Sequence, residues 1–551
     1  MSEMTINFSH VYHARFLVEA ATPLALGSGE RGLHVDRLVA TDAYGLPYLP
    51  GTSLAGVVRH ALEGQLDVDV MNQLFGFQNR TEGQGSRILF TAGHLVGPGG
   101  NVYGEGGTLP VDDPFLQQVQ TRPLPERDHV RINHRGVADA EGYGKFDEQV
   151  VPRGARFCFE LWLEGGSGDA DHWQQLIAIF SQPFFRIGGG TRKGFGEIDV
   201  KGLKTRTFDL TDATDLEAYL DTPSVLRAPA VTATNESDTA TAHQDWTHYQ
   251  ITLKPKDYFL FGAGYNTHEV NQQPKREWVI HWDGDRPRID HARRPYLIPA
   301  TSVKGALSHR TAFHYNRLTG RNIENCRPEA PSLDTQAVAK ELWEAQLATL
   351  PHVPEFDDTT EDTAAIQARV DELKAAIGRI EALELDEKSI TEHKDYKGYV
   401  AERQAYTSQR VYPHTGERNA AVRALFGYAV EREEEQSQQR GRVILSDSYL
   451  EKVTPKIFSH VMIDRYTGGA LQGALFNEEV TATQKQLRLS IYVNETAFAD
   501  HDYNDAAISG SHVRQAFECA LNDLCTGRLA LGGNVAKGHG TFSGTYEKTN
   551  P

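Results

Sequence analysis

Residues 48–56 have the sequence YLPGTSLAG, and residues 297–305 repeat this pattern as LIPATSVKG. In both places the segment continues into a stretch that favours a helix. Further matched segments follow in the same order in the two halves: LFGF at 74–77 and LFGY at 425–428, HVRIN at 129–133 and HVMID at 460–464, KFDE at 145–148 and LFNE at 475–478, and IGGGTRKGFG at 187–196 and LGGNVAKGHG at 531–540. These collinear matches indicate an internal duplication, which constrains the whole architecture.

Each copy has the same order of predicted elements. An opening strand is followed by a helix, a strand, a second helix, a glycine-rich loop and a last strand. Thr52 or Ser53 is expected to cap the first helix of the first copy, and Thr301 or Ser302 its counterpart in the second copy. The order of elements predicts an α+β protein with two tandem ferredoxin-like (RRM-like) domains.

Composition places the domain boundaries. The first domain is expected at 1–202 and the second at 246–551, because residues 203–245 are rich in Thr, Ala and Asp and have the character of a linker. The second copy also contains extra residues at about 318–424. Apolar residues recur there at helical spacing, which predicts an inserted helical hairpin with helices at 338–350 and 364–385.

Charge and cysteine content limit the class of protein. The net charge of -18 argues against a free-standing basic nucleic-acid binder. Residues 321–420 contribute -8 of that charge, so any nucleic-acid binding must be local and lie outside the insertion. The four cysteines form no C-x-x-C pair, which favours a reducing compartment without structural zinc. No apolar stretch approaches the length of a membrane span, so we expect a cytoplasmic protein.

The run G-x-P-Y-L-P-G-T-S-L-x-G, the later L-F-G before a strand and the terminal G-G-G-x-x-x-G-F-G resemble the RAMP superfamily of CRISPR proteins, and within it the backbone subunits of type III effector complexes. The resemblance covers nearly all of both copies and excludes the linker and the insertion. Two fused backbone units are most similar to the type III-D variant. The resemblance implies these partners: guide RNA, single-stranded target RNA, a large polymerase-like subunit, further backbone subunits and a small subunit.

The resemblance also implies that each RAMP domain has a β-hairpin thumb that wedges between guide and target bases. The thumbs are expected near 129–146 and 460–476. Apolar side chains such as Ile132, Met462 and Ile463 could stack against opened bases; alternatively, the isoleucines are core residues of a strand. The polar thumb residues that we expect to face RNA are His129, His134, His460 and Arg465.

Contacts with RNA phosphates are expected at the two helix N-termini and at the two glycine loops. Free backbone N–H groups at a helix start favour an anion, and glycine lets the backbone approach RNA closely. Neither loop satisfies the pattern of an NTP-binding P-loop. The residues that we expect at these contacts are Ser53, Arg59, Arg192, Lys193, Ser302, Lys304, Arg310 and Lys537.

The family resemblance implies that a cleavage-competent subunit has an aspartate in the loop after its first strand, before the G-x-P run. Asp36 stands at that place. It could accept the proton of an RNA 2'-OH or hold a hydrated Mg²⁺ against the phosphate, with His34 and Arg37 as helpers. The resemblance therefore implies a metal-dependent endoribonuclease that acts within an antiviral ribonucleoprotein complex.

The second copy departs from this pattern. Counting back from Thr301 by the interval between Asp36 and Thr52 leads to Asp285, with Asp290 and Asp283 nearby. Pairing the strands of the two copies leads instead to Arg276 or Glu277. The sequence leaves open whether the second copy has an active site.

Three other functions share much of this pattern. A non-catalytic scaffold differs only in the role of Asp36. A guide-precursor processing endoribonuclease of the same superfamily needs a general acid, for which His34 or His60 is available. A soluble enzyme that does not act on RNA is disfavoured because the sequence lacks a metal-ligand cluster, a nucleophile elbow and a dinucleotide fingerprint.

Overall fold

The chain forms two compact units, which are Met1–Tyr315 together with Ala420–Pro551, and Asn316–Asn419. The first unit contains both copies of the repeat, and the second corresponds to the predicted insertion. The computed structural model describes residues 8–104, 109–132, 138, 144–231, 245–264, 270–290, 294–321, 341, 368, 371, 374–375, 394–406, 414–428, 439–503 and 506–550. None of the helices in these ranges is long and apolar enough to cross a membrane.

The first domain is built on an antiparallel sheet in the order β4-β8-β1-β9. The strands are β1 (His10–Ala20), β4 (Ile88–Phe90), β8 (Arg156–Gly165) and β9 (Ile198–Asp209), and β5 (His94–Leu95) also pairs with β8. Helices α1 (Gly51–Leu62) and α4 (Ala170–Ala178) connect the strands. Phe16 and Phe159 stack in the core with centroids 5.2 Å apart. This strand order confirms the predicted ferredoxin-like fold.

The second domain repeats the arrangement. Its sheet has the order β16-β20-β10-β23. The strands are β10 (Trp246–Pro255), β16 (Val443–Leu445), β20 (Leu487–Asn494) and β23 (Phe542–Thr549), and the helices are α6 (Ala300–Leu318) and α12 (Gly510–Thr526). Corresponding strands occupy corresponding places in both sheets, which confirms the tandem repeat.

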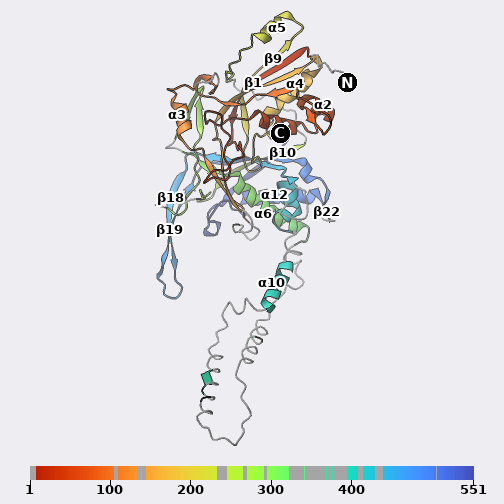
Figure 1. The fold of residues 1–551 in the computed structure, drawn as a ribbon. Helices are drawn as coiled ribbons and strands as arrows, with labels where there is room; N and C mark the ends of the chain where they lie inside the picture. Colours follow the sequence, from red (N-terminus) through yellow and green to blue (C-terminus); the bar gives the residue numbers. More distant parts are fainter. Residues whose placement is uncertain are drawn as a thin grey trace. The chain divides into compact units, whose positions relative to one another are not determined.

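Both predicted thumbs are antiparallel hairpins. The first pairs β6 (Glu126–Val130) with β7 (Lys145–Gln149), and the second pairs β18 (Thr454–Ile463) with β19 (Ala470–Ala482). Figure 1 shows β18 and β19 as a long hairpin that extends away from the sheets of its unit. The first thumb continues into residues outside the described set, so only its base is visible.

The helix starts differ from the predicted caps. Helix α1 begins at Gly51 after Pro50, whose side chain makes no capping hydrogen bond, so Thr52 and Ser53 lie inside the first turn. A Cβ atom at Gly51 would lie 2.3 Å from the carbonyl oxygen of Phe90, which explains why this turn requires glycine. Helix α6 begins at Ala300, and its N-terminus is capped from a distant part of the chain, because the Ala300 N–H donates to Asp447 at 2.8 Å.

The boundary after the first domain also differs from the prediction. Strand β9 runs to Asp209 and α5 (Ala213–Leu220) follows, so the first part of the predicted linker 203–245 is folded. The remaining elements of the larger unit are α2 (Val68–Phe75), β2 (Phe77–Gln78), β3 (Gly83–Gln84), α3 (Pro114–Thr121), β11 (Ile280–Asp283), β12 (Arg286–Ile289), β13 (Tyr296–Ile298), α11 (Ala420–Phe426), β14 (Gly427–Tyr428), β15 (Gln439–Arg440), β17 (Ser448–Leu450), β21 (His501–Tyr503) and β22 (Ala506–Ile508).

The β11–β12 hairpin joins the two domains. Although it belongs to the second copy by sequence, Ile280 and Ile289 are buried in the core cluster of the first domain, together with Trp278. A Cβ atom at Gly154 would lie 1.9 Å from the carbonyl oxygen of Ile280, so the two backbones are in close contact there. The two domains therefore share a core and form one unit.

The ends of the insertion lie close together. Asn316 donates from its side-chain amide to the His414 carbonyl at 2.9 Å, and the buried Asn419 donates to the side-chain oxygen of Asn316 at 2.9 Å. Within the insertion the structure describes α10 (Lys394–Tyr406), and the predicted helices at 338–350 and 364–385 lie largely outside the described residues. The insertion can therefore be removed where its ends already meet.

We expect that replacing residues 323–413 with a short Gly/Ser bridge leaves RNA binding by the folded chain largely intact and alters assembly with partner proteins. The replaced segment is acidic, which makes it a poor surface for RNA. The replacement keeps His414 and Asn419, so the hydrogen bonds that close the junction are retained. RNA binding and the melting temperature are measured on the same preparation, and loss of RNA binding with an unchanged melting temperature contradicts the prediction.

Candidate functional site

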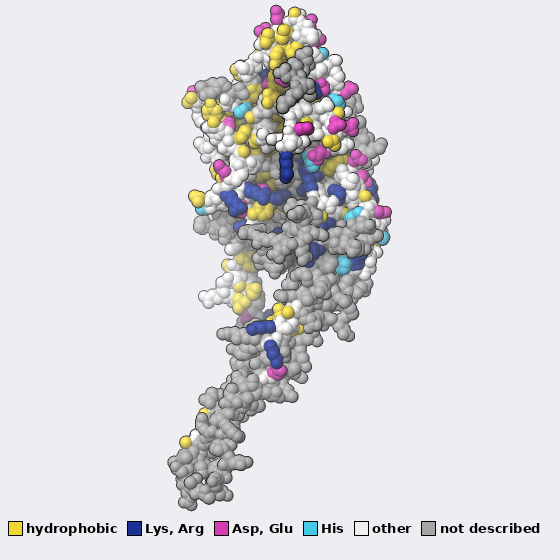
Figure 2. Space-filling model, turned by 45° about the vertical axis from the view of Figure 1, so that its right-hand side comes forward, with side chains coloured by type: hydrophobic (Ala, Val, Ile, Leu, Met, Phe, Trp, Pro, Cys, Tyr) yellow, Lys and Arg dark blue, Asp and Glu magenta, His cyan; other side chains and the backbone are white. Residues whose placement is uncertain are grey.

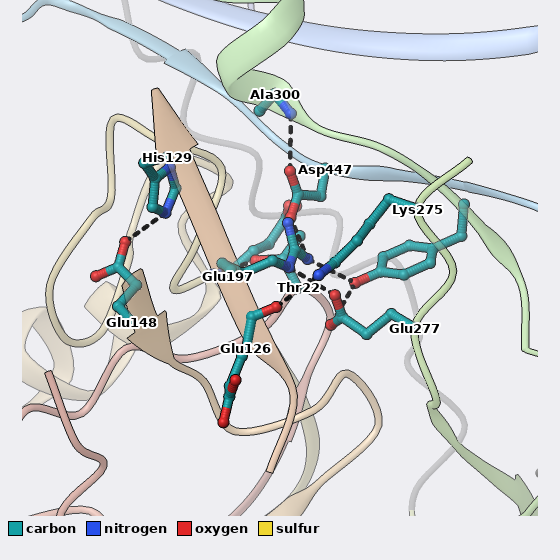
Figure 3. Close-up of polar contacts among 11 residues, drawn as sticks. Thr22, Glu126, His129, Glu148, Glu197, Lys275, Glu277, Ala300 and Asp447 are labelled. Atoms are coloured by element: carbon teal, nitrogen blue, oxygen red, sulfur yellow. Dashed lines mark hydrogen bonds and ion pairs between the residues drawn. The ribbon is translucent and has the colours of Figure 1, made fainter. Parts of the chain in front are cut away.

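The base of the first thumb contains a buried polar cluster. His129 on β6 lies directly opposite Phe146 on β7, and their rings stack with centroids 4.8 Å apart. Glu148, whose side chain is 3% exposed, places Oε1 2.7 Å from His129 Nε2 and 3.2 Å from Lys193 Nζ. Figure 3 shows the His129–Glu148 contact. We call these four residues the first thumb-base cluster.

The second domain repeats the cluster residue for residue. His460 stacks on Phe476 at 4.9 Å, and Glu478 accepts from His460 at 2.7 Å and from Lys537 at 3.0 Å. The two lysines also lie over the matching aromatic rings, Lys193 at 4.2 Å from the Phe146 centroid and Lys537 at 4.3 Å from that of Phe476. The duplication therefore extends from the fold to individual contacts.

A buried carboxylate must be neutralised by partners to remain charged. Although burial raises the pKa of Glu148, His129 and Lys193 lower it to about 2. Burial likewise raises the pKa of Glu478, and Lys537 and His460 bring it below its usual value. Each glutamate thus anchors a lysine from the glycine loop to the base of its thumb. Lys193 and Lys537 therefore lie beside the two thumbs, and their contact with RNA stays a prediction.

Asp36 is exposed and lies against the same thumb base. The backbone N–H of Asp147 donates to its Oδ2 at 3.0 Å, and the N–H of Gln149 donates to the carbonyl of the next residue, Arg37, at 2.9 Å. Arg37 also lies over the ring of Phe146 at 5.5 Å. Asp36 is therefore held beside β7 by both a side-chain and a backbone contact.

The second domain has the same register with a different residue. The N–H of Asn477 donates to the side-chain oxygen of Asn271 at 2.8 Å, and the N–H of Glu479 donates to the carbonyl of Gln272 at 2.8 Å. Arg37 and Glu148 form an isolated parallel β-bridge, and Gln272 and Glu478 form the corresponding bridge in the second domain. The structure therefore matches Asp36 with Asn271.

This register corrects both alignments that the sequence suggested. Asp285 lies in the β11–β12 turn, where its carbonyl accepts from Gly99 of the first domain at 3.1 Å, and Asp290 is exposed just after β12. Glu277 bonds to Arg127 of the first domain, and Arg276 pairs with Glu479. None of these four occupies the position that corresponds to Asp36, because the segment between that position and the helix start is longer in the second copy than in the first.

The two thumb bases also differ in charge. Asp128 lies directly opposite Asp147 on the first hairpin, whereas Ser459 lies opposite Asn477 on the second. Partial burial and the carboxylate of Asp128 raise the pKa of Asp147, and Asp36 raises it further. Carboxylates that face each other across a strand pair are destabilising. The first domain thus holds three carboxylates where the second has Asn271 and two other neutral side chains.

These carboxylates provide limited support for a metal ion. Nowhere in the described ranges do three His, Cys, Asp or Glu side chains form a group arranged to hold a metal. Mg²⁺ often binds through one or two carboxylates, with water and substrate phosphates as its other ligands. Asp36 is exposed and could serve as such a carboxylate, so the site fits a divalent ion that arrives with RNA better than a resident one.

The thumb residues that we expected to contact bases lie at the surface. Ile132 is 47% exposed and Ile463 is 52% exposed, so they are not core residues. Arg465 is exposed in the turn between β18 and β19, and the neighbouring Tyr466, which the sequence analysis missed, is 99% exposed. His134 lies outside the described residues.

A cleft with a volume of about 260 Å³ lies at the start of α1. It is lined by Leu26, Ser53 and Gly189, which bring together the loop after β1, the helix start and the glycine loop. The N–H of Ser53 donates to the Pro50 carbonyl at 2.9 Å, and the N–H of Ser302 donates to Pro299 at 3.0 Å. These two N–H groups are therefore engaged within the helix start, and Ser53 can contribute its side chain to the cleft.

Three predicted RNA-binding residues make contacts within the protein. Arg59 donates to the Gly76 carbonyl at 3.2 Å and packs α1 onto the end of α2. Arg310 donates to Asp523 on α12 at 2.6 Å, and Lys304 lies over the ring of Phe426 at 6.0 Å. These contacts hold helices together, so the structure gives these residues a place in packing.

The first thumb is also tied to the second domain. Arg127 on β6 donates to Glu277 at 2.6 Å and to Asp447 at 2.9 Å. Asp447 also accepts from the N–H of Ala300 at the start of α6 (Figure 3). Burial raises the pKa of Asp447 to about 6, and Arg127 opposes that rise. This network connects the base of the first thumb to the helix start of the second domain.

A family model described as the RAMP superfamily matches residues 17–199 and 280–543, which together make up well over half of the chain. The chain belongs to the RAMP superfamily. One matched segment falls in each of the two ferredoxin-like domains, so this protein is a tandem RAMP protein. No curated protein matches its sequence.

Among solved structures, this RAMP protein is similar to a chain of the structure titled "Type III-B Cmr-beta Cryo-EM structure of the Apo state". The sequence identity is 15% and the TM-score is 0.27, and the match covers 35% of this chain and 96% of that chain. A similarity at this level carries no argument about function, which rests on the site itself.

Proposed function

We propose that this tandem RAMP protein is a backbone subunit of a type III CRISPR effector complex, and that it binds guide and target RNA and cleaves the target beside the first thumb. One observation supports the proposal above all others. Both domains contain the same thumb-base cluster, but the carboxylates of Asp36, Asp128 and Asp147 occur only in the first. Because the thumb-base cluster is present in both domains, each domain is expected to bind RNA. Because the three carboxylates are present only in the first domain, cleavage is expected only there.

The thumbs supply the proposed binding function. Opening a base step costs a few kcal/mol, and stacking of bases on aromatic or apolar side chains offsets that cost. The second thumb presents Met462, Ile463 and Tyr466 to solvent at its far end. Exposed apolar groups on a projecting hairpin suit insertion between bases. Lys193 and Lys537 at the two thumb bases supply positive charge for the phosphates on either side.

Asp36 is the proposed catalytic residue of the cleavage step. A strand that is bent at the thumb can place its own 2'-OH in line with the adjacent phosphate, so the protein needs mainly to orient the RNA. The exposed carboxylate of Asp36 can accept the 2'-OH proton, while Lys193 and Arg37 stabilise phosphate charge. Mg²⁺, if Asp36 holds it together with RNA oxygens, would supply further neutralisation of that charge. Cleavage that resists chelation by EDTA favours the direct-base role.

The second domain acts in this proposal as a binding domain without its own cut. Asn271, which stands in register with Asp36, has no carboxylate and cannot accept a proton as Asp36 can. The alternative is that both domains act only as a scaffold for RNA. This alternative is consistent with every contact described and differs only in that Asp36 has no catalytic role. A guide-processing nuclease is the second alternative, with His34 or His60 as its general acid; His60 is engaged with Glu63 at 2.8 Å, and His34 is exposed. The expected partners follow from the resemblance to type III backbone subunits, and the proposed cytoplasmic location follows from the cysteine pattern and the lack of a long apolar stretch.

Purification of the native complex followed by RNA extraction tests the proposal. We expect a guide RNA of defined 5' end to copurify, and we expect the complex to cut a complementary single-stranded RNA without cutting an unrelated one. The fused RAMP protein should remain with other effector subunits throughout the purification. A complex that contains no RNA, or one that binds complementary RNA no better than unrelated RNA, would overturn the proposal.

A further inference from the structure

The two sheets have outer faces, opposite the helices of their domains, that correspond residue by residue. On the first outer face, His13 of β1 stacks on Trp162 of β8 with ring centroids 3.9 Å apart. On the second, His248 of β10 stacks on Tyr492 of β20 with centroids 4.4 Å apart. Both pairs join residues that lie directly opposite each other in the strand register. Because alternate residues of a strand share a face, these pairs align the two outer faces along their length.

The outer face of the second sheet is the surface on which the first domain docks. Phe184, just before the first glycine loop, stacks on Trp246 of β10 with centroids 4.6 Å apart. Arg186 donates to the Ser446 hydroxyl, just after β16, at 3.1 Å. Ile444, which points to the same face, is 1% exposed. The two domains are therefore joined head to tail through unlike surfaces, an arrangement that can continue into further domains.

The outer face of the first sheet is covered by the chain itself. Residues 213–230, which consist of α5 and the segment after it, cross this face, and we call them the strap. Tyr219 of the strap lies edge-on to Phe208 of β9 and to Trp162, with centroids at 5.6 and 6.3 Å. Phe208 pairs with the residue of β1 that corresponds to Trp246. Tyr219 thus covers the part of this face that receives the first domain in the second sheet.

The rest of the strap is buried against the same face. Leu226 belongs to a small core cluster with Leu17 of β1 and Cys158 of β8. Gly202 pairs with Leu17, and a Cβ atom there would lie 2.7 Å from the Ala230 carbonyl oxygen, so the strap passes directly over this glycine. The corresponding row of the second sheet consists of larger or polar residues, which are Thr252, Arg488 and Thr545. The first outer face is therefore adapted to its own strap.

The opposite end of the tandem repeat is uncovered. Thr191 of the first glycine loop is 8% exposed, because this loop contacts the second domain. Its hydroxyl accepts from Arg440 at 2.9 Å, and Arg192 donates to the Gly441 carbonyl at 2.6 Å. Val535, at the corresponding position of the second glycine loop, is 45% exposed. The surface that joins the first domain to the second is thus present again on the second domain, where it is exposed.

We infer that the strap is an end cap, which closes the docking face of the first domain and makes this chain the end of a row of RAMP domains. A further RAMP domain then docks only beside the second glycine loop. The identity of that partner rests on the proposed function. A segment of the same chain acts at an effective concentration on the order of millimolar, so a partner that competes for the first face must displace the strap.

The thiol of Cys158 reports whether the strap is closed. N-ethylmaleimide labels the isolated full chain, and peptide mass spectrometry follows each cysteine. Leu226→Ala should accelerate labelling of Cys158 by at least about tenfold, because it truncates a buried side chain that holds the strap on the sheet. Cys525, which is buried in the second domain, should keep its rate and so exclude global unfolding. Equal labelling of Cys158 in the wild type and Leu226→Ala would overturn the inference.

Leu220→Ala is the matched control for the labelling experiment. Leu220 is 71% exposed on the outward side of α5, and hydrophobic side chains are visible in Figure 2 at the upper end of the larger unit, where Figure 1 places α5. Its truncation should leave the labelling rate of Cys158 unchanged. A rate that rises as much as in Leu226→Ala would show that labelling does not report contact between the strap and the sheet, and would contradict the end cap.

Photocrosslinking in the native complex tests the direction of the row. The photoreactive amino acid p-benzoylphenylalanine replaces either Val535 or Leu89, which corresponds to Ile444 and remains 60% exposed at the edge of the first face. We expect crosslinks to another RAMP subunit from position 535 and none from position 89. Crosslinks to a RAMP subunit from position 89, or from neither position, would overturn the end cap. A complex without any further RAMP subunit would instead contradict the proposed function, and labelling of Cys158 would still test the strap.

Discussion

Asp36→Asn is expected to remove one target-RNA cleavage product while the complex binds guide and target RNA as before. General acid–base catalysis contributes a factor of about 10²–10⁴, so cleavage at that position should fall by at least two orders of magnitude. The fold should survive, since Asn271 occupies the matching position in the second domain and accepts the same backbone hydrogen bond. Gel analysis of end-labelled target in the assembled complex measures the loss, and filter binding measures affinity.

Two further variants sharpen the test. Asn271→Ala is the matched control and should leave every cleavage product in place, because Asn271 has no role in proton transfer. The double variant Asn271→Asp/Asn477→Asp introduces two carboxylates at the base of the second thumb. It tests whether the lack of carboxylates is the only reason why the second domain does not cleave RNA. A complete product ladder at wild-type rates from Asp36→Asn would make the first domain a scaffold and refute the catalytic assignment.

Glu148→Gln is expected to cause the largest loss of stability. The substitution removes the carboxylate that neutralises Lys193 and contacts His129, and breaking a buried ion pair from one side costs about 3–5 kcal/mol. The loss should be concentrated at the base of the first thumb. Hydrogen exchange of the amides in β6 and β7, together with urea unfolding, measures it. Glu63→Gln, an exposed surface glutamate, should change neither quantity.

The pH dependence of the stability difference between the wild type and Glu148→Gln provides an independent check. The pKa of Glu148 is lowered from 4.5 to about 2 in the folded protein, so its contribution is fully present above pH 4.5 and is lost as the pH falls towards 2. The wild type should therefore lose its advantage over Glu148→Gln across that range. A stability difference that stays constant between pH 5 and pH 2, within the range where both proteins fold, would rule out the ion-pair explanation.

The matched segments of the sequence predicted the architecture correctly because secondary structure depends mainly on residues that are close together in the chain. Strand and helix periodicity, together with the order of the repeats, is sufficient to place β1 and β10, and the resemblance to the RAMP superfamily placed both thumbs. The same segments contained the thumb-base glutamates, since KFDE and LFNE both end in the buried Glu148 or Glu478. A glutamate that is kept between two diverged copies was an available signal for that cluster.

The sequence by itself determined that this chain has two ferredoxin-like RAMP domains with hairpin thumbs, and it identified Asp36 as the acid to consider. Only the tertiary structure decided which residue of the second domain corresponds to Asp36. Counting back from the helix start fails because the segment before the helix is longer in the second copy, whereas the backbone hydrogen bonds of Gln149 and Glu479 set the register in space. The structure likewise showed that Glu148 neutralises Lys193, because these two residues are distant in sequence and meet only in the fold.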